Sequence, residues 1–276
     1  MLINGTIVNP LRGLSSGSFP SLKSLTIGGP KGGGYHSLDP NSILDLFHRA
    51  PNLIECAFDQ ILTPAGHDPA PRPRVLPNLR HLRFGRSLEC LYSDNGLLRY
   101  ITLPGLQTLI VSMDSSNDDD EDEEVLIAFL KRSSPPLQKL GICDRSYIES
   151  DESFHFPRMQ EYLPLLPTLT HIELWAPPPG FVRKLFAILA SPLLPHLQSL
   201  RIVRYCSDTF PALWAVLHRA LTGRRTHLTH LTILYDSDGL SIDQPDAEIC
   251  DVFRQLVVVD GMEIFIGYEQ QNWISV

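Results

Sequence analysis

The chain has few cysteines, and they do not form a pattern that would staple a small secreted fold. The five are an odd set, without a Cys-x-x-Cys pair or the paired capping cysteines of extracellular repeat proteins: Cys56, Cys90, Cys143, Cys206 and Cys250. Disulfide frameworks use even numbers of cysteines in oxidising compartments. We therefore expect reduced thiols in an intracellular protein, located in the cytoplasm or nucleus.

Long apolar runs are also missing. No window of the sequence holds the 18 or more uncharged apolar residues that a membrane-spanning helix needs. Residues 1–20 lack the basic start and apolar core of a secretory signal. The sequence thus predicts no membrane association and no secretion.

Motifs of catalysis and phosphate binding are present only in incomplete form. Residues 13–17 match the Gly-x-Ser-x-Gly pattern, but a strand follows where a nucleophile elbow needs a helix. The glycine-rich stretch 28–34 lacks the Gly-Lys-(Ser/Thr) ending of a phosphate loop, so we expect a flexible connection there. The ten histidines show no metal-ligand spacing with cysteines or carboxylates. We expect no enzyme activity, no cofactor and no metal.

What the chain does contain is one short phrase, Leu-x-x-Leu-x-(Ile/Leu/Val/Phe), repeated eight times. Intervals of 26 to 32 residues separate the first leucines of the phrases: Leu22, Leu53, Leu79, Leu106, Leu137, Leu169, Leu197 and Leu228. This spacing is typical of leucine-rich repeats. Side chains alternate along a strand, so the later apolar residues, such as Leu82 and Phe84, should point into a core. Cys56 takes one such position and should pack as a small hydrophobe.

Helical patterns lie between the phrases. Apolar spacing and capping signals predict five helices, at residues 41–50, 123–132, 180–190, 211–221 and 246–257. The intervals after Leu79 and Leu137 are weaker and should hold 3₁₀ turns or loops. The expected fold class is α/β: a curved leucine-rich-repeat solenoid of the ribonuclease-inhibitor-like kind, with a parallel concave sheet, convex helices and about 8 to 9 irregular repeats. We expect a single domain over residues 1–276, with repeats over about 19–266.

Several repeats open with the longer phrase (Leu)-Pro-x-Leu-x-x-Leu-x-Ile, as at residues 76–82, 103–106 and 194–197. With the unequal spacing, this resembles the leucine-rich-repeat region of fungal F-box proteins over roughly residues 19–266. In that family the repeats recruit a protein substrate, and an F-box ahead of them docks the Skp-type adaptor of a cullin ubiquitin ligase. The resemblance implies substrate-recognition repeats. No F-box is visible before Leu22, so adaptor and cullin binding are expected only if one exists upstream.

The residues that alternate with the core positions should line the exposed concave wall, where such solenoids bind their partners. We select ten of them as candidate partner contacts: His81, Arg83, Lys139, His171, Glu173, Trp175, Arg201, Val203, His230 and Leu234. The wall also includes smaller residues such as Ala57, Ser112 and Cys143. Its mixed charges argue against nucleic acid, which requires a basic stripe. Trp175 and Arg201 are of the types that carry binding energy at interfaces, although Trp175 could instead cover the edge of the stack.

Seven consecutive acidic residues, 118–124, account for nearly all of the formal net charge of −8. Such a run repels itself, so we expect a disordered insertion at residues 114–123 and a helix that begins at Glu123 and Glu124, near its positive end. The acidic loop residues are Asp118, Asp119, Asp120, Glu121 and Asp122. A solvated loop is the default interpretation and a basic partner segment the alternative. Calcium is disfavoured because the run has no glycine turn or spaced ligands.

Taken together, these patterns predict a monomeric, non-enzymatic protein-binding scaffold. One alternative is a leucine-rich-repeat regulator of a GTPase, which would need an exposed arginine and asparagine pair at one end of the wall. Another is a truncated fragment without an independent function. For residues 268–276, both a cap on the last strand and a free tail stay open.

Overall fold

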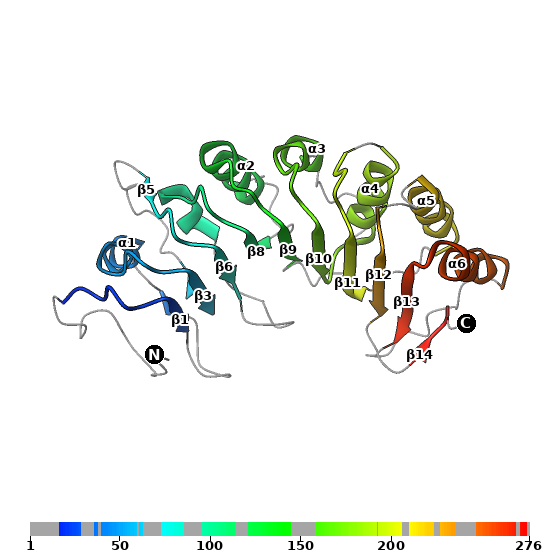
Figure 1. Cartoon of the computed structure of the whole chain (residues 1–276), viewed down its shortest axis with the longest axis horizontal. Coiled ribbons are helices and arrows are strands. Elements are labelled where there is room, and N and C mark those ends of the chain that lie inside the picture. Colours follow the sequence, from blue (N-terminus) through cyan, green and yellow to red (C-terminus); the bar gives the residue numbers. More distant parts are fainter. Residues whose placement is uncertain are drawn as a thin grey trace. The chain divides into compact units, whose positions relative to one another are not determined.

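A computed structural model describes most of the chain. The described residues are 17–28, 36–37, 40–59, 61–62, 73–85, 95–113, 121–144, 158–191, 193–205, 210–223, 227–235, 247–268 and 271–274. They belong to two compact units, Met1–Leu137 (unit 1) and Gln138–Val276 (unit 2). Each unit combines helices with a mostly parallel sheet (Figure 1). The α/β class is therefore confirmed, and the single domain stays a prediction.

Unit 1 contains four parallel strands that are adjacent in chain order: β1 (Ser24–Gly28), β3 (Glu55–Asp59), β6 (His81–Phe84) and β8 (Thr108–Met113). Shorter parallel pairs join β2 (His36–Ser37) to β4 (Ile61–Leu62) and β5 (Arg74–Val75) to β7 (Ile101–Thr102). The helices are α1 (Pro40–Arg49), the 3₁₀ helix η1 (Asn95–Tyr100) and α2 (Glu121–Ser133).

Unit 2 is more regular, because strands and helices alternate along the chain. Its parallel strands are β9 (Lys139–Asp144), β10 (His171–Trp175), β11 (Ser199–Tyr205), β12 (His230–Tyr235) and β13 (Glu263–Tyr268). The helices between them are α3 (Met159–Tyr162), the 3₁₀ helix η2 (Leu163–Leu165), α4 (Pro179–Leu189), α5 (Phe210–Gly223) and α6 (Ala247–Asp260). A final strand, β14 (Gln271–Asn272), pairs antiparallel with β13.

The leucine phrase marks the start of each main strand. The second and third apolar residues of all eight phrases are buried, each at most 8% exposed. In β13 the corresponding positions are Ile264 and Ile266, and Met262 stands where the other copies have their first leucine. The sequence patterns therefore placed the core correctly. They did not single out this ninth strand, because its phrase lacks the leading leucine.

Backbone hydrogen bonds at the strand starts recur with the period of the phrase. In unit 2 the carbonyl oxygen of Gln138 accepts from the amides of Thr170 and His171, at 2.9 Å each. The same double acceptance is made by Thr170 and Gln198 in unit 2 and by Lys23, Ile54 and Arg80 in unit 1, whereas the Thr229 carbonyl oxygen accepts from the amide of Glu263 alone among these bonds. One carbonyl thus sets the register of the next strand.

The five predicted helices are all present, and each begins and ends within three residues of its expected bounds. The two weak intervals contain the 3₁₀ helices η1 and η2, as expected, and also the single α-helical turn α3, which was not expected. Gly261, with φ of 66°, follows α6 directly, in the left-handed conformation that commonly ends helices. Capping and apolar spacing were sufficient signals because each helix buries one face against its sheet.

The acidic run requires a correction. Helix α2 begins at Glu121, so Glu121, Asp122 and Glu123 are helical rather than part of a disordered insertion. Glu123 is 5% exposed. Carboxylates are stabilised in the first turn by the positive end of the helix dipole, which offsets their mutual repulsion. Residues 114–120, with Asp118, Asp119 and Asp120, lie outside the described residues.

Arg132 connects the end of α2 to the preceding repeat of unit 1. Its Nη2 donates to the carbonyl oxygens of Leu98 (2.6 Å) and Ile101 (2.7 Å), and its Nε donates to Thr102 Oγ1 (3.2 Å). Partial burial lowers the pKa of the guanidinium from its ordinary value. The side chain thus supplies donors to one carbonyl within η1 and to one at the start of β7.

Replacing Arg132 should therefore destabilise unit 1. We expect Arg132→Met to lower the free energy of unfolding by about 2 kcal/mol, because the apolar stem stays but two backbone acceptors lose their donor. Urea unfolding followed by circular dichroism measures this loss. The control is Lys131→Met, at an exposed position of the same helix, which should change stability by less than about 0.5 kcal/mol. Equal effects of the two substitutions would contradict the assignment.

The C-terminal segment of unit 2 packs onto the last parallel strand, which decides between the cap and the free tail for residues 271–274. The Asn272 side chain accepts from the Ile266 amide (3.1 Å) and donates to the Ile264 carbonyl oxygen (3.2 Å). The Trp273 ring stacks on Tyr235 with centroids 5.1 Å apart and meets Tyr268 edge-on at 5.6 Å. These residues form a cap on β13.

Gly267 allows this cap to lie against the strand. Its φ is 152°, and a Cβ built there would meet the backbone carbonyl of Gln271. We expect Gly267→Ala to lower the free energy of unfolding by about 2 kcal/mol, since both the backbone and the crossing chain must shift. Thermal unfolding tests this. Gly180→Ala is the control: nothing lies within 4 Å of the position that its Cβ would take, and alanine favours the helix it would occupy.

Candidate functional site

The candidate site is the face of the unit 2 sheet opposite its helices, which we call the open face. Helices α4, α5 and α6 lie on one side of the strands (Figure 1). No helix among the described residues covers the other side. Strand register places outward side chains in three rows across β9 to β13: Lys139, His171, Ser199, His230, Glu263; Gly141, Glu173, Arg201, Thr232, Phe265; and Cys143, Trp175, Val203, Leu234, Gly267.

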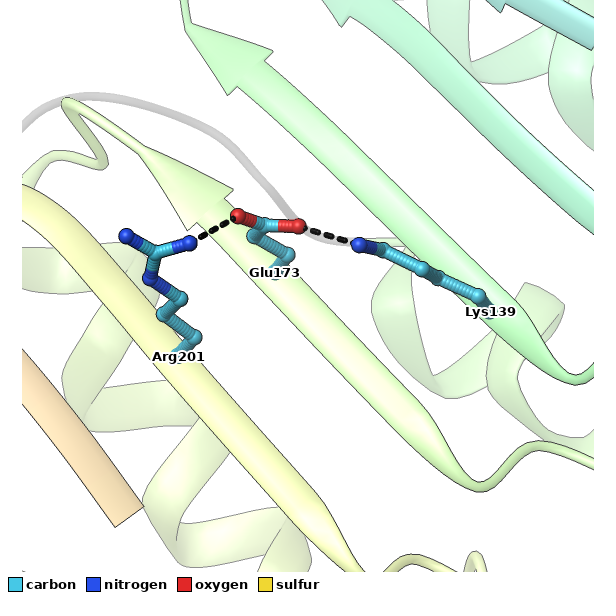
Figure 2. Close-up of polar contacts among 3 residues, drawn as sticks. All are labelled: Lys139, Glu173 and Arg201. Atoms are coloured by element: carbon cyan, nitrogen blue, oxygen red, sulfur yellow. Dashed lines mark hydrogen bonds and ion pairs between the residues drawn. The ribbon is translucent and has the colours of Figure 1, made fainter. Parts of the chain in front are cut away.

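A carboxylate held between two cations stands at the centre of the open face. Glu173 Oε1 accepts from Arg201 Nη1 at 3.0 Å, and Glu173 Oε2 lies 2.6 Å from Lys139 Nζ (Figure 2). The Glu173 side chain is 9% exposed, against 39% for Lys139 and 50% for Arg201. The three residues, named here the charged triad, come from three adjacent strands. The triad carries a net charge of +1 and presents its cations to solvent.

Two histidines of the first row are held by the same local arrangement. Thr170 Oγ1 donates to the carbonyl oxygen of Gln138 (3.0 Å) and lies 2.8 Å from Nδ1 of His171. A hydroxyl has one proton, so the ring must donate Nδ1–H to the threonine oxygen and leave Nε2 facing outward. Thr229 and His230 repeat these contacts at 3.2 and 2.7 Å.

His230 has an additional neighbour. Its Nε2 lies 3.3 Å from Oε2 of Glu263 on the next strand. Because Nδ1–H is engaged by Thr229, this contact is favourable only when Nε2 also carries a proton. The pair is exposed, at 52% for the His230 side chain and 78% for Glu263, so solvent weakens it.

The third row is apolar and more covered than expected. Trp175 and Leu234 are half-buried, whereas Val203 between them is 5% exposed and Cys143 beside Trp175 is 4% exposed. Neighbouring strands are only about 4.8 Å apart, so a small side chain is shaded by large ones in its row. Val203 is thus no exposed contact residue, which corrects the prediction.

Other wall predictions also need correction. Glu173 faces the open side, but the residue is only 7% exposed and its carboxylate is bound by its two cationic neighbours, so it is not an exposed partner contact. In unit 1, Ser112 is fully buried, and Ala57 is 4% exposed between Thr26 and Arg83 in the register. The other eight predicted contacts are half-buried or exposed: His81, Arg83, Lys139, His171, Trp175, Arg201, His230 and Leu234.

The ten candidates do not all fall in one place. His81 and Arg83 belong to unit 1, on β6, and the other eight belong to unit 2. In unit 1, His81 is exposed, and the Arg83 Nε is buried without a hydrogen-bond partner among the described residues. The charged triad brings three of the unit 2 candidates into contact. The sequence held a signal for this contact, since Glu173 and Arg201 occupy the same position of consecutive phrases.

One feature was missed by sequence reasoning. A hollow of about 420 Å³ lies beside β13 at the end of the sheet, and residues from the open face, from the end of α6 and from the cap line it: His230, Thr232, Val257, Glu263, Phe265 and Asn272 among them. Part of its wall comes from the chain that turns back at β14, and this turn lies outside the repeating sequence pattern, so the pattern could not predict the hollow. Its lining mixes polar and apolar side chains and includes the His230–Glu263 pair.

Metal-ligating side chains do not cluster within the described part of the chain, where no three His, Cys, Asp or Glu residues gather. None of the described helices is long and apolar enough to cross a membrane. Comparison of the chain with protein-family models, curated proteins and solved structures finds no match. The site must therefore be interpreted from its own geometry.

The charged triad gives a stability test. Replacing both cations, in Lys139→Gln/Arg201→Gln, leaves a poorly solvated carboxylate without compensation and should lower the free energy of unfolding by about 1–2 kcal/mol. Adding Glu173→Gln removes the stranded charge and should recover at least half of that loss. Urea unfolding of the double and triple variants measures both changes in the free energy of unfolding. A triple variant no more stable than the double would show that the carboxylate is not stabilised by these cations.

Proposed function

We propose that the chain is a non-enzymatic protein-binding scaffold that holds a partner protein on the open face of unit 2. The observation that carries this proposal is the parallel sheet with one face packed by helices and the other lined by exposed Arg201, His171 and His230. All-parallel sheets are normally covered on both faces. An uncovered face with arginine and tryptophan side chains suits a partner that completes the cover.

We further propose that each unit is built from leucine-rich repeats and belongs to a ribonuclease-inhibitor-like solenoid. The support is the periodic double acceptance at the strand starts, with intervals of 26 to 32 residues, and the strand-to-helix alternation of unit 2. Such repeats stack by contacts with their neighbours and use the sheet side for binding.

The phrase and its spacing support a narrower assignment, to the substrate-recognition repeats of an F-box-like ubiquitin-ligase receptor. In this role the chain would hold the substrate, and a Skp-type adaptor and cullin would join only through an F-box upstream. The three described cysteines are buried thiols outside any disulfide, which is compatible with a reducing, cytoplasmic or nuclear setting: Cys56, Cys143 and Cys250.

The chemistry of the open face favours binding over catalysis. Glu173 is locked between two cations, so it orients Lys139 and Arg201 instead of standing ready as an acid or base in a cavity. Arg201 and half-buried Trp175 offer a planar donor fork and an aromatic surface on neighbouring strands. Both are side-chain types that dominate the energetics of protein interfaces.

An affinity purification from the native lysate tests the proposal. We expect wild-type chain to retain a partner that Trp175→Ala/Arg201→Ala loses at least tenfold by quantitative mass spectrometry. The matched control is Arg183→Ala/Lys184→Ala, at exposed positions of α4 on the helical side, which should retain it. Equal recovery with all three proteins would contradict binding through the open face. Recovery of adaptor and cullin with a full-length gene product would support the F-box-like assignment.

A further inference from the structure

The charge of the open face is unevenly distributed. Its exposed carboxylate, Glu263, lies on β13, two strands and thus about 10 Å from Arg201 on β11, and it contacts His230. The other described carboxylate of the three rows, Glu173, already faces two cations. The part of the open face over β9 to β11 therefore carries a positive surplus, although the chain as a whole has a formal net charge of −8.

The cations of this part retain hydrogen-bonding capacity. Arg201 uses Nη1 for Glu173, and its Nε and Nη2 have no partner among the described residues. Lys139 has three N–H donors and one acidic contact. Glu173 also holds both side chains in place between the strands, which reduces the entropy that a partner must remove when it binds. A planar fork of this kind matches a carboxylate, which can accept two parallel bonds.

An apolar surface adjoins the cations at a defined distance. Trp175 lies two residues after Glu173 on β10, and half-buried Leu234 stands in the same row two strands away, with buried Val203 between them. Two residues along a strand span about 6.6 Å, which is also the separation between same-side side chains of an extended peptide. A segment lying along the strands can thus contact the charged triad and Trp175 with successive same-side residues.

We infer that the occupant of the open face is an extended segment of a partner protein. In this segment an Asp or Glu side chain binds Arg201 and Lys139, and a large apolar side chain two residues away packs against Trp175. This inference rests on the proposed protein-binding function and specifies the chemistry of the partner. A basic segment is disfavoured because it would meet two cations, and a wholly apolar one would remove water from the donors that Glu173 does not use and offer them no acceptor.

A peptide selection tests the inference on the full chain. Random decapeptides displayed on phage are selected on immobilised wild-type protein, with counter-selection on Arg201→Gln. We expect enriched peptides to share an Asp or Glu and a large apolar residue two positions apart, in one consistent order. Enrichment of basic or uncharged peptides overturns the inference, and so does a selection that yields no peptide sensitive to Arg201.

Synthetic peptides from the selection then give the size of the effect by fluorescence polarisation. We expect Arg201→Gln to weaken binding at least tenfold and the control Arg183→Gln to change it less than twofold. Changing the acidic residue of the peptide to its amide should weaken binding to wild type by a similar factor and have little effect on Arg201→Gln, because the two changes remove the same contact. This peptide arm leaves the protein unaltered, so a folding defect cannot imitate it. Additive losses overturn the inference.

The outcome also separates this inference from the proposed function. Peptides that lose affinity on Trp175→Ala but contain no acidic residue would refute the acidic segment and leave the open face as a protein-binding surface. A partner captured from lysate and lost in Trp175→Ala/Arg201→Ala, but without an acidic segment in its binding region, would refute the acidic segment in the same way. If neither experiment finds binding that depends on the open face, both the inference and the proposed function fail.

Discussion

Both units depend on a single backbone arrangement, in which the carbonyl before one strand accepts from two amides at the start of the next: that of the residue preceding the strand and that of its first residue. In unit 2 this runs from Gln138 through Thr170 and Gln198, and each step fixes where the following strand begins. Once the start is fixed, the alternation of side chains along the strand decides which residues enter the core and which face outward. A shift by one residue would exchange the two faces, so the buried leucines and this arrangement enforce the same register.

The open face follows from that register. Residues from separate repeats, such as Lys139, Glu173 and Arg201, meet because they stand at fixed places in consecutive strands. The same rule places the two Thr-His pairs at equivalent positions, where a threonine hydroxyl bonds the preceding repeat and orients the ring. The surface is thus a direct product of the spacing between repeats. At exposed positions such as His171 and His230 its chemistry can change without disturbing the core, whereas Val203 and Cys143 face the same side but are buried.

The eight strands that carry the leucine phrase, their core residues and the five longer helices could be predicted from the sequence, since each depends on local spacing and capping. The exposure of individual wall residues could not, because it depends on side chains from neighbouring strands: Val203 is shaded by Trp175 and Leu234. Helix α2 begins earlier than charge repulsion alone predicted, because the helix dipole favours acidic residues in its first turn. The cap on β13 was left open for want of a repeating pattern. The charged triad was foreseen as three separate wall residues, and only the register joined them.

Asn272 has a consequence for how the protein behaves among its own copies. A parallel sheet that ends on an unpaired strand offers its backbone as a template for further strands, and neighbouring molecules can extend it without limit. The Asn272 side chain hydrogen-bonds to the Ile264 carbonyl oxygen and the Ile266 amide of β13. These two backbone groups are therefore already paired and cannot bond to a further strand. Together with the antiparallel pairing of β14, this leaves fewer unpaired backbone groups along β13, which limits edge-to-edge contact between copies of the protein at this strand.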